Sequence, residues 1–158
     1  MSACSYADFF IAIKRREKTG GIVTLNVISN PDNASRAKYT IARVVYAQSG
    51  AASLRLAEAF ASIIYNVSHA RGCAPIDVAT DAATFDVNNA GARGHDDLSV
   101  RADDARFQMC LRVVERMLNG NLVDVCCGAT RFHRDGELPT WARARGFIAE
   151  IDGFLFYA

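Results

Sequence analysis

Hydrophobic positions recur at helical spacing in three long stretches of the chain. The first stretch begins at residue 33 or 35 and runs to about 48, the second covers residues 53–68, and the third covers residues 99–119. In the third stretch the apolar residues stand three and four positions apart, and Gly120 follows the last of them. This pattern predicts three long helices, the last two separated by an irregular segment, residues 69–98.

Shorter patterns lie near the two ends of the chain. Residues 5–18 carry a short helical stripe, and residues 22–28 alternate loosely, as a strand does. Three apolar pieces near the C-terminus have the length of short strands: 122–126, 130–133 and 154–157. Helices followed by strands predict an α+β fold, mainly helical with a small C-terminal antiparallel sheet.

Gln48 is unusual in the first of the long helices. At about 100° per residue, Gln48 falls in the middle of an apolar stripe. The stripe consists of Ala37, Ile41, Val44 and Val45. A polar amide at this position points toward the core or into a cleft. Two interpretations remain open: a buried glutamine that caps backbone groups of the following loop, or a side chain that faces a functional cleft.

The composition fits one globular domain and excludes a strongly electrostatic role. The 158 residues are 51% hydrophobic, and 18 Lys plus Arg against 17 Asp plus Glu leave a net charge of +1. A phosphate backbone requires more positive charge than this, so we expect no nucleic-acid partner. The longest apolar run, residues 57–65, contains Glu58 and is too short to cross a bilayer, so we expect no membrane partner.

Metal and cofactor chemistry is not indicated. The five cysteines are irregularly spaced, and Cys126 is adjacent to Cys127, which suits no common disulfide framework and favours free thiols. A zinc site would need both of these residues, His133 and a fourth ligand at no recognised spacing. We therefore expect no metal and no organic cofactor.

Three separated segments of the chain carry a recognisable order of motifs. The first is Ile-Ala-Arg-Val-Val-Tyr-Ala-Gln-Ser-Gly-Ala-Ala-Ser at 41–53 with Ala-Glu-Ala-Phe-Ala-Ser-Ile-Ile-Tyr-Asn-Val at 57–67, and the second is Ala-Thr-Phe-Asp at 83–86. The third is Gly-Ala-Thr-Arg-Phe-His at 128–133, Leu-Pro-Thr-Trp-Ala-Arg at 138–143 and Ile-Asp-Gly-Phe-Leu-Phe-Tyr at 151–157. Together they resemble the SleB-type cell wall hydrolases, the spore-cortex-lytic enzymes, with their A-R-x-V-Y-x-E-A-R-G-E, G-A-x-x-F-H-N, P-x-W-A-R and I-G-x-H-x-F-Y patterns.

This resemblance implies a small lysozyme-like domain, residues 38–158, that acts on the glycan strands of peptidoglycan, with residues 1–37 as an extension packed on it. Family members cleave the bond between N-acetylmuramic acid and N-acetylglucosamine, typically as lytic transglycosylases. One carboxyl group donates a proton to the glycosidic oxygen and then accepts the proton of the muramyl 6-hydroxyl as the anhydro ring closes.

The chain departs from the family at the catalytic position. The first Glu of the family stretch is Gln48 here, its Arg is Gly50, and its second Glu is Ala52. A carboxamide can hydrogen-bond a sugar, but it has no titratable proton and cannot act as a general acid. Asp86 is the best candidate for a substitute acid, because the corresponding family segment flanks the cleft. If the family groove is retained, Gln48→Glu should raise muralytic activity.

The resemblance also implies a substrate groove next to Gln48. The residues expected to bind substrate there are Tyr46, Phe85, His133, Trp141 and Tyr157. Trp141 suits sugar stacking, because an indole face packs against pyranose C–H surfaces, yet the only tryptophan of the chain suits a core position equally well. His133 fits a groove residue and a structural histidine equally.

The leading functional hypothesis is a peptidoglycan-directed glycosidase-family domain of lytic transglycosylase or muramidase type, weakened or inactive (a pseudoenzyme) because of Gln48. One alternative is a non-catalytic module that binds glycan or a protein partner. A second alternative is a structural component of a phage-like particle. The start of the chain lacks the features of a signal peptide, so we expect a cytoplasmic protein, or one carried to the cell wall by a non-classical or phage-like route.

Overall fold

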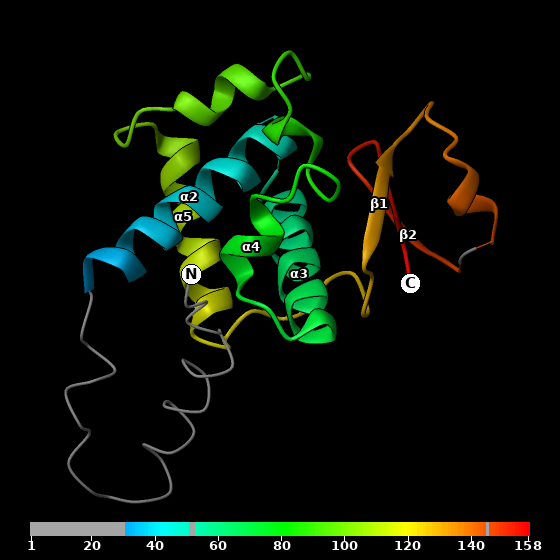
Figure 1. Ribbon diagram of the computed structural model, residues 1–158, viewed down its shortest axis with the longest axis horizontal. Helices are drawn as coiled ribbons and strands as arrows, with labels where there is room; N and C mark the ends of the chain where they lie inside the picture. The colour runs from blue at the N-terminus through cyan, green and yellow to red at the C-terminus, as the bar shows by residue number, and fades with distance from the viewer. Residues whose placement is uncertain (1–30, 51–52, 145) are drawn as a thin grey trace, which may run out of the picture.

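The computed structural model describes residues 31–50, 53–144 and 146–158. The predicted helix over residues 5–18 and the predicted strand over residues 22–28 lie outside these residues. The described elements are, in chain order, α2 (Pro31–Ser49), α3 (Leu54–Arg71), α4 (Pro75–Ala79), the 3₁₀ helices η2 (Asp86–Asn88) and η3 (His95–Ser99), α5 (Ala105–Leu118), β1 (Arg131–Arg134), the 3₁₀ helix η4 (Thr140–Ala144), β2 (Phe147–Ile151) and β3 (Phe154–Tyr157). The described part is mainly helical and ends in a small antiparallel sheet, which confirms the predicted α+β class (Figure 1).

Side-chain caps set the ends of the long helices. The hydroxyl of Ser53 accepts a hydrogen bond from the amide of Leu56 at 3.1 Å, which caps the start of α3. The backbone of Gly72 is left-handed, and its amide donates to the carbonyl of Ser68, which caps the end of α3. The carboxylate of Asp104 accepts hydrogen bonds from the amides of Arg106 and Phe107 in the first turn of α5. The helix therefore starts at 105 and not at the predicted 99, because this cap fixes its first turn.

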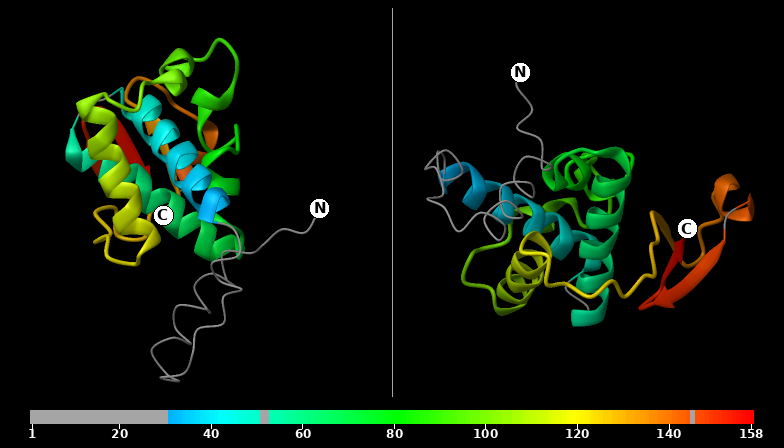
Figure 2. Two further views of the ribbon diagram at one scale, coloured as in Figure 1. Left: turned by 90° about the vertical axis from the view of Figure 1, so that its left-hand side faces the viewer. Right: turned by 90° about the horizontal axis from the view of Figure 1, so that it is seen from below.

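The apolar faces of α2, α3 and α5 pack against one another and form the core (Figure 2). The large side chains that lose all solvent exposure there include Leu56, Phe60, Ile63, Ile64 and Phe107. The predicted domain boundary after residue 37 falls within α2, which begins at residue 31. In the described residues, no helix combines the length and the apolar character that a membrane crossing requires.

The sheet has the strand order β1-β3-β2, and both pairings are antiparallel. The predicted strand over residues 122–126 is wrong, because the carboxylate of Asp124 accepts the amides of Cys126 and Gly128 and bends this segment into a turn. Strand β2 was not predicted; it forms by pairing with β3 around a register irregularity between Phe147 and Ala149.

One face of the sheet, here called the inner face, rests on α3 through aromatic rings. The ring of Phe60 on α3 lies 4.9 Å from Phe132, 5.0 Å from Phe154 and 5.9 Å from Phe156, centroid to centroid. Such aromatic pairs add to the free energy gained by burial. The other face, here called the outer face, points away from the helices, and η4 lies on that side of the sheet (Figure 1).

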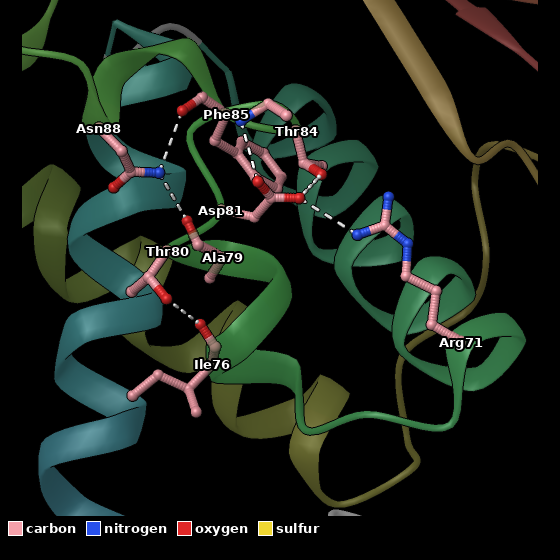
Figure 3. Close-up of polar contacts among 9 residues, drawn as sticks. Arg71, Ile76, Ala79, Thr80, Asp81, Thr84, Phe85 and Asn88 are labelled. Carbon is pink, nitrogen blue, oxygen red and sulfur yellow. Dashed lines mark hydrogen bonds and ion pairs between the residues drawn. The ribbon is translucent and has the colours of Figure 1, made fainter.

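A satisfied network of polar groups shapes the loop between α4 and η2. The carboxylate of Asp81 accepts hydrogen bonds from the amide of Ala83, the hydroxyl of Thr84 and the guanidinium of Arg71, at 2.9, 2.8 and 3.1 Å (Figure 3). The side-chain amide of Asn88 donates to the carbonyls of Ala79 and Phe85, at 2.9 and 3.0 Å. This network places Phe85 and the following Asp86 beside the sheet.

Candidate functional site

Gln48 lies in the last turn of α2, and its side chain is sealed from solvent. It is 1% exposed, and neither its Nε2 nor its Oε1 has a hydrogen-bond partner among the described residues. The expectation of an open groove at Gln48 is therefore wrong, because the core closes over the stripe to which Gln48 belongs. The capping interpretation also fails for the described residues, because the amide is buried without a backbone partner.

Phe85 belongs to the packing between the helices and the sheet and does not line a groove. Its ring is fully buried, 6.1 Å from Phe60 and 5.3 Å from Phe132. The aromatic side chains of α3, the inner face and the loop before η2 thus form one cluster. We expect Phe85 to contribute to stability, since burial of a phenyl ring contributes about 2–3 kcal/mol.

Asp86, the candidate substitute acid, follows Phe85 and reaches the edge of the sheet. Its carboxylate lies 3.8 Å from the guanidinium of Arg134 on β1, and the two side chains are 50% and 20% exposed. The same guanidinium covers the ring of Phe154 at 4.9 Å from the centroid. Asp86 therefore sits in a surface ion pair and lacks the apolar enclosure that surrounds a typical glycosidase acid.

Three of the predicted site residues meet on the outer face of the sheet. The ring of His133 stacks on Tyr157 with centroids 5.3 Å apart, and Trp141 of η4 lies edge-on to both, at 5.7 and 5.5 Å. His133 and Tyr157 are 7% and 8% exposed, and Trp141 is half-buried. The structure thus brings together residues that are up to 24 positions apart in the chain.

Hydrogen bonds fix the orientation of the histidine ring. Its Nδ1 lies 2.8 Å from the carbonyl of Arg134, and its Nε2 lies 3.1 Å from the hydroxyl of Tyr157. A carbonyl can only accept, so Nδ1 carries the hydrogen, and in the neutral ring Nε2 accepts from the tyrosine. His133 therefore holds Tyr157 and the turn after β1 in place, which is a structural role.

Tyr46 is not part of this cluster. Its ring packs edge-on against Phe107 of α5, with centroids 6.2 Å apart, and its side chain is half-buried. Burial raises the pKa of Tyr46, and the carboxylates of Asp104 and Asp97 raise it further. The contacts place Tyr46 between α2 and α5.

Two further residues of the outer face, Arg131 and Phe147, are not among those that the sequence predicts. The guanidinium of Arg131 lies 5.3 Å from the ring centroid of Trp141, and the ring of Phe147 lies edge-on to Tyr157 at 5.7 Å while remaining 57% exposed. The predicted strand over residues 130–133 would have placed Arg131 on the same face as His133, since side chains two apart in a strand share a face. Phe147 gave no such signal, because its strand was not predicted.

The remaining chemistry-bearing groups do not form a second centre within the described residues. No three His, Cys, Asp or Glu side chains lie close enough to hold a metal ion there. The four described cysteines are free, and burial raises the pKa of Cys110 to about 11 and of Cys126 to about 12. A pocket of about 100 Å³ lies between α3 and α5, lined by Ser62, Tyr65, Met117, Gly120, Leu122 and Asp124.

Comparison with known proteins gives no match: no family model, curated protein or solved structure is similar to this chain.

Proposed function

We propose that this chain is a peptidoglycan-directed domain of the SleB-like type that binds glycan strands and cleaves them very slowly or not at all. The resemblance of the three segments supports the choice of substrate. The observation that carries the loss of activity is Gln48, an amide at the position of the family acid that is 1% exposed and has no partner among the described residues.

The chemistry of the reaction explains the expected loss. A lytic transglycosylase needs one group that first donates and then accepts a proton, and an amide does neither. General acid assistance typically contributes about 10²- to 10⁴-fold to the rate. The enclosure of Gln48 adds a second obstacle, because a sugar cannot reach a sealed side chain without opening the core.

Binding is supported by the outer face of the sheet. Trp141, His133 and Tyr157 are held there in one aromatic cluster, and the neighbouring Phe147 is 57% exposed. Aromatic faces are the usual partners of pyranose C–H surfaces, so this is the part of the described surface that best suits a glycan strand.

An enzyme that uses Asp86 as its acid is the second candidate. The observation in its favour is access, since the Asp86 carboxylate is 50% exposed beside β1. Against it stands the ion pair with Arg134 and the lack of an apolar enclosure.

The test combines sedimentation with purified peptidoglycan and analysis of released products for anhydro-muramic ends. We expect the chain to sediment with peptidoglycan and the products to stay at the level of a heat-inactivated blank. Product release that Asp86→Asn abolishes would favour the second candidate. Failure to sediment would remove the glycan proposal and leave a protein partner or a structural role in a particle.

A further inference from the structure

The strand register places a cation and an exposed ring in one row across the outer face. Arg131 on β1 pairs with Tyr157 on β3, and Tyr157 pairs with Phe147 on β2. Side chains opposite each other in a sheet lie on the same face. The next row along the strands consists of His133, Leu155 and Glu150.

The ends of the first row differ in chemistry and are both accessible. Phe147 is 57% exposed, and its ring meets Tyr157 at its edge. Arg131 is exposed, and its guanidinium rests on Trp141 at 5.3 Å from the ring centroid. Arg131 takes part in no ion pair within residues 31–50, 53–144 and 146–158, so none of these residues neutralises its charge.

The row therefore has a fixed spacing between an apolar contact and a positive charge. One strand separates the two ends, which puts their backbones about 10 Å apart. The cation–π contact with Trp141 holds the Arg131 guanidinium over the cluster and reduces the entropy lost on binding. A rigid ligand with a ring and a negative charge at similar spacing complements this arrangement better than a flexible one.

We propose that the row Arg131–Tyr157–Phe147 is a subsite for a carboxylate-bearing glycan, with a pyranose ring against Phe147 and the carboxylate on Arg131. This rests on the proposed function and deepens it. The occupant is a glycan strand whose muramic residues carry a free lactyl carboxylate, that is, a strand without stem peptides. The carboxylate is then joined to the sugar ring only through the short lactyl ether, which keeps it close to the ring.

Calorimetric titration of the full chain tests this with two soluble ligands: glycan strands freed of stem peptides by an amidase, and neutral N-acetylglucosamine oligomers. We expect Arg131→Gln to weaken binding of the acidic strands about tenfold, because one charge-assisted contact is lost. The affinity for the neutral oligomers should not change. Arg131→Lys should retain part of the affinity. Phe147→Ala should weaken both ligands about tenfold, because the ring contact does not depend on charge.

Matched controls exist elsewhere on the surface. Arg101→Gln removes an arginine whose side chain is 84% exposed, and Leu138→Ala removes an apolar side chain that is 77% exposed. Neither should change the affinity for either ligand. Thermal unfolding of each variant verifies that the sheet is intact.

The outcomes separate the subsite from the proposed function. If the wild-type chain binds neither ligand nor intact peptidoglycan, both fall. If it binds glycan and Arg131→Gln behaves like Arg101→Gln, the subsite is wrong and the proposed function stands. Tighter binding of intact peptidoglycan that is lost in Arg131→Gln would assign the carboxylate to the stem peptide and overturn the chosen occupant.

Discussion

Two polar sites on the helical body differ in how their polar atoms are satisfied. In the loop between α4 and η2, Asp81 and Asn88 use their side chains to bind backbone and side-chain groups, each within about 3 Å. At the end of α2, Gln48 is more deeply buried, yet both of its polar atoms lack partners among the described residues. The hydrogen bonds of Asp81 and Asn88 stabilise the loop, which accounts for the polar residues at the first site. No such bond among the described residues accounts for Gln48.

This contrast is the reason to connect Gln48 with function. A buried polar group without a partner costs about 1–3 kcal/mol, so stability alone would favour an apolar residue there. Under the proposed function, Gln48 stands at the position of the catalytic glutamate of the SleB-type enzymes, which would account for a side chain of this size and polarity in the core.

The largest expected effect is that of Gln48→Glu. A carboxyl group sealed in the core without a partner has a raised pKa, and we expect a loss of about 3 kcal/mol in the free energy of unfolding at pH 7.5. Because the folded pKa lies above the unfolded value of about 4.3, the folded state holds the extra proton, and stability falls as the pH rises above about 4.3. Urea unfolding at pH 4.5 and at pH 7.5 measures this.

Gln108→Glu is the matched control for that experiment. Gln108 is half-buried on α5, and its amide donates to the carbonyl of Ala102 in a solvent-exposed contact. Gln108→Glu loses that hydrogen bond but leaves its carboxylate in contact with water. The free energy of unfolding of Gln108→Glu should depend on pH little more than that of the wild-type chain. Equal pH dependence of the two variants would show that Gln48 is not sealed. With an open groove at position 48, Gln48→Glu would raise muralytic activity. With a sealed side chain there, we expect no such gain.

The second effect concerns the satisfied site. Asp81→Asn should cost about 1–2 kcal/mol at pH 7, because it removes the charge from three hydrogen bonds. The amide of Ala83, the hydroxyl of Thr84 and Arg71 lower the pKa of Asp81 in the folded state, in that order. Its stabilisation is therefore present above the unfolded pKa and is lost as the pH falls through the lowered folded value.

Chemical unfolding of Asp81→Asn at pH 7 and pH 3 follows this loss. Asp103→Asn is the control, since its carboxylate is 69% exposed and pairs with the exposed Arg101. We expect a change within about 0.5 kcal/mol for that variant. An Asp81 variant as mild as the Asp103 variant would mean that the network in Figure 3 contributes little.

The smallest effect has the opposite sign. Gln48→Met keeps the length of the side chain and removes both unpaired atoms, so it should raise the free energy of unfolding by about 1 kcal/mol. Gln108→Met, which removes a satisfied amide, should not stabilise the chain. A destabilised Gln48→Met variant would show that the Gln48 amide has a partner after all.

The sequence predicted the elements whose signal is local. The long helices and the strands at 131–134 and 154–157 follow from the period of their apolar residues and from caps such as Ser53. Strand β2 and helix η4 could not be predicted in this way, because β2 depends on pairing with β3 and η4 is a single short turn packed on the outer face.

The candidate site was predicted only in part, because some of its contacts depend on strand pairing and not on a local signal. The motifs that resemble those of the SleB-type enzymes pointed to His133, Trp141 and Tyr157, which do meet in space. Helical angles placed Gln48 on the apolar stripe, but an angle does not show whether the stripe faces a groove or a sealed core. Arg131 and Phe147 become neighbours of one row only through the strand register, which no local pattern specifies.

The most direct test of the account is one incubation of the wild-type chain with purified peptidoglycan, in which the bound fraction and the anhydro-muramic ends are measured in the same sample. The account predicts that the chain sediments with peptidoglycan while anhydro-muramic ends stay at the level of the heat-inactivated blank, and that Asp86→Asn changes neither value. Release of anhydro-muramic ends by the wild-type chain, abolished in Asp86→Asn, would contradict it and would identify Asp86 as the catalytic acid.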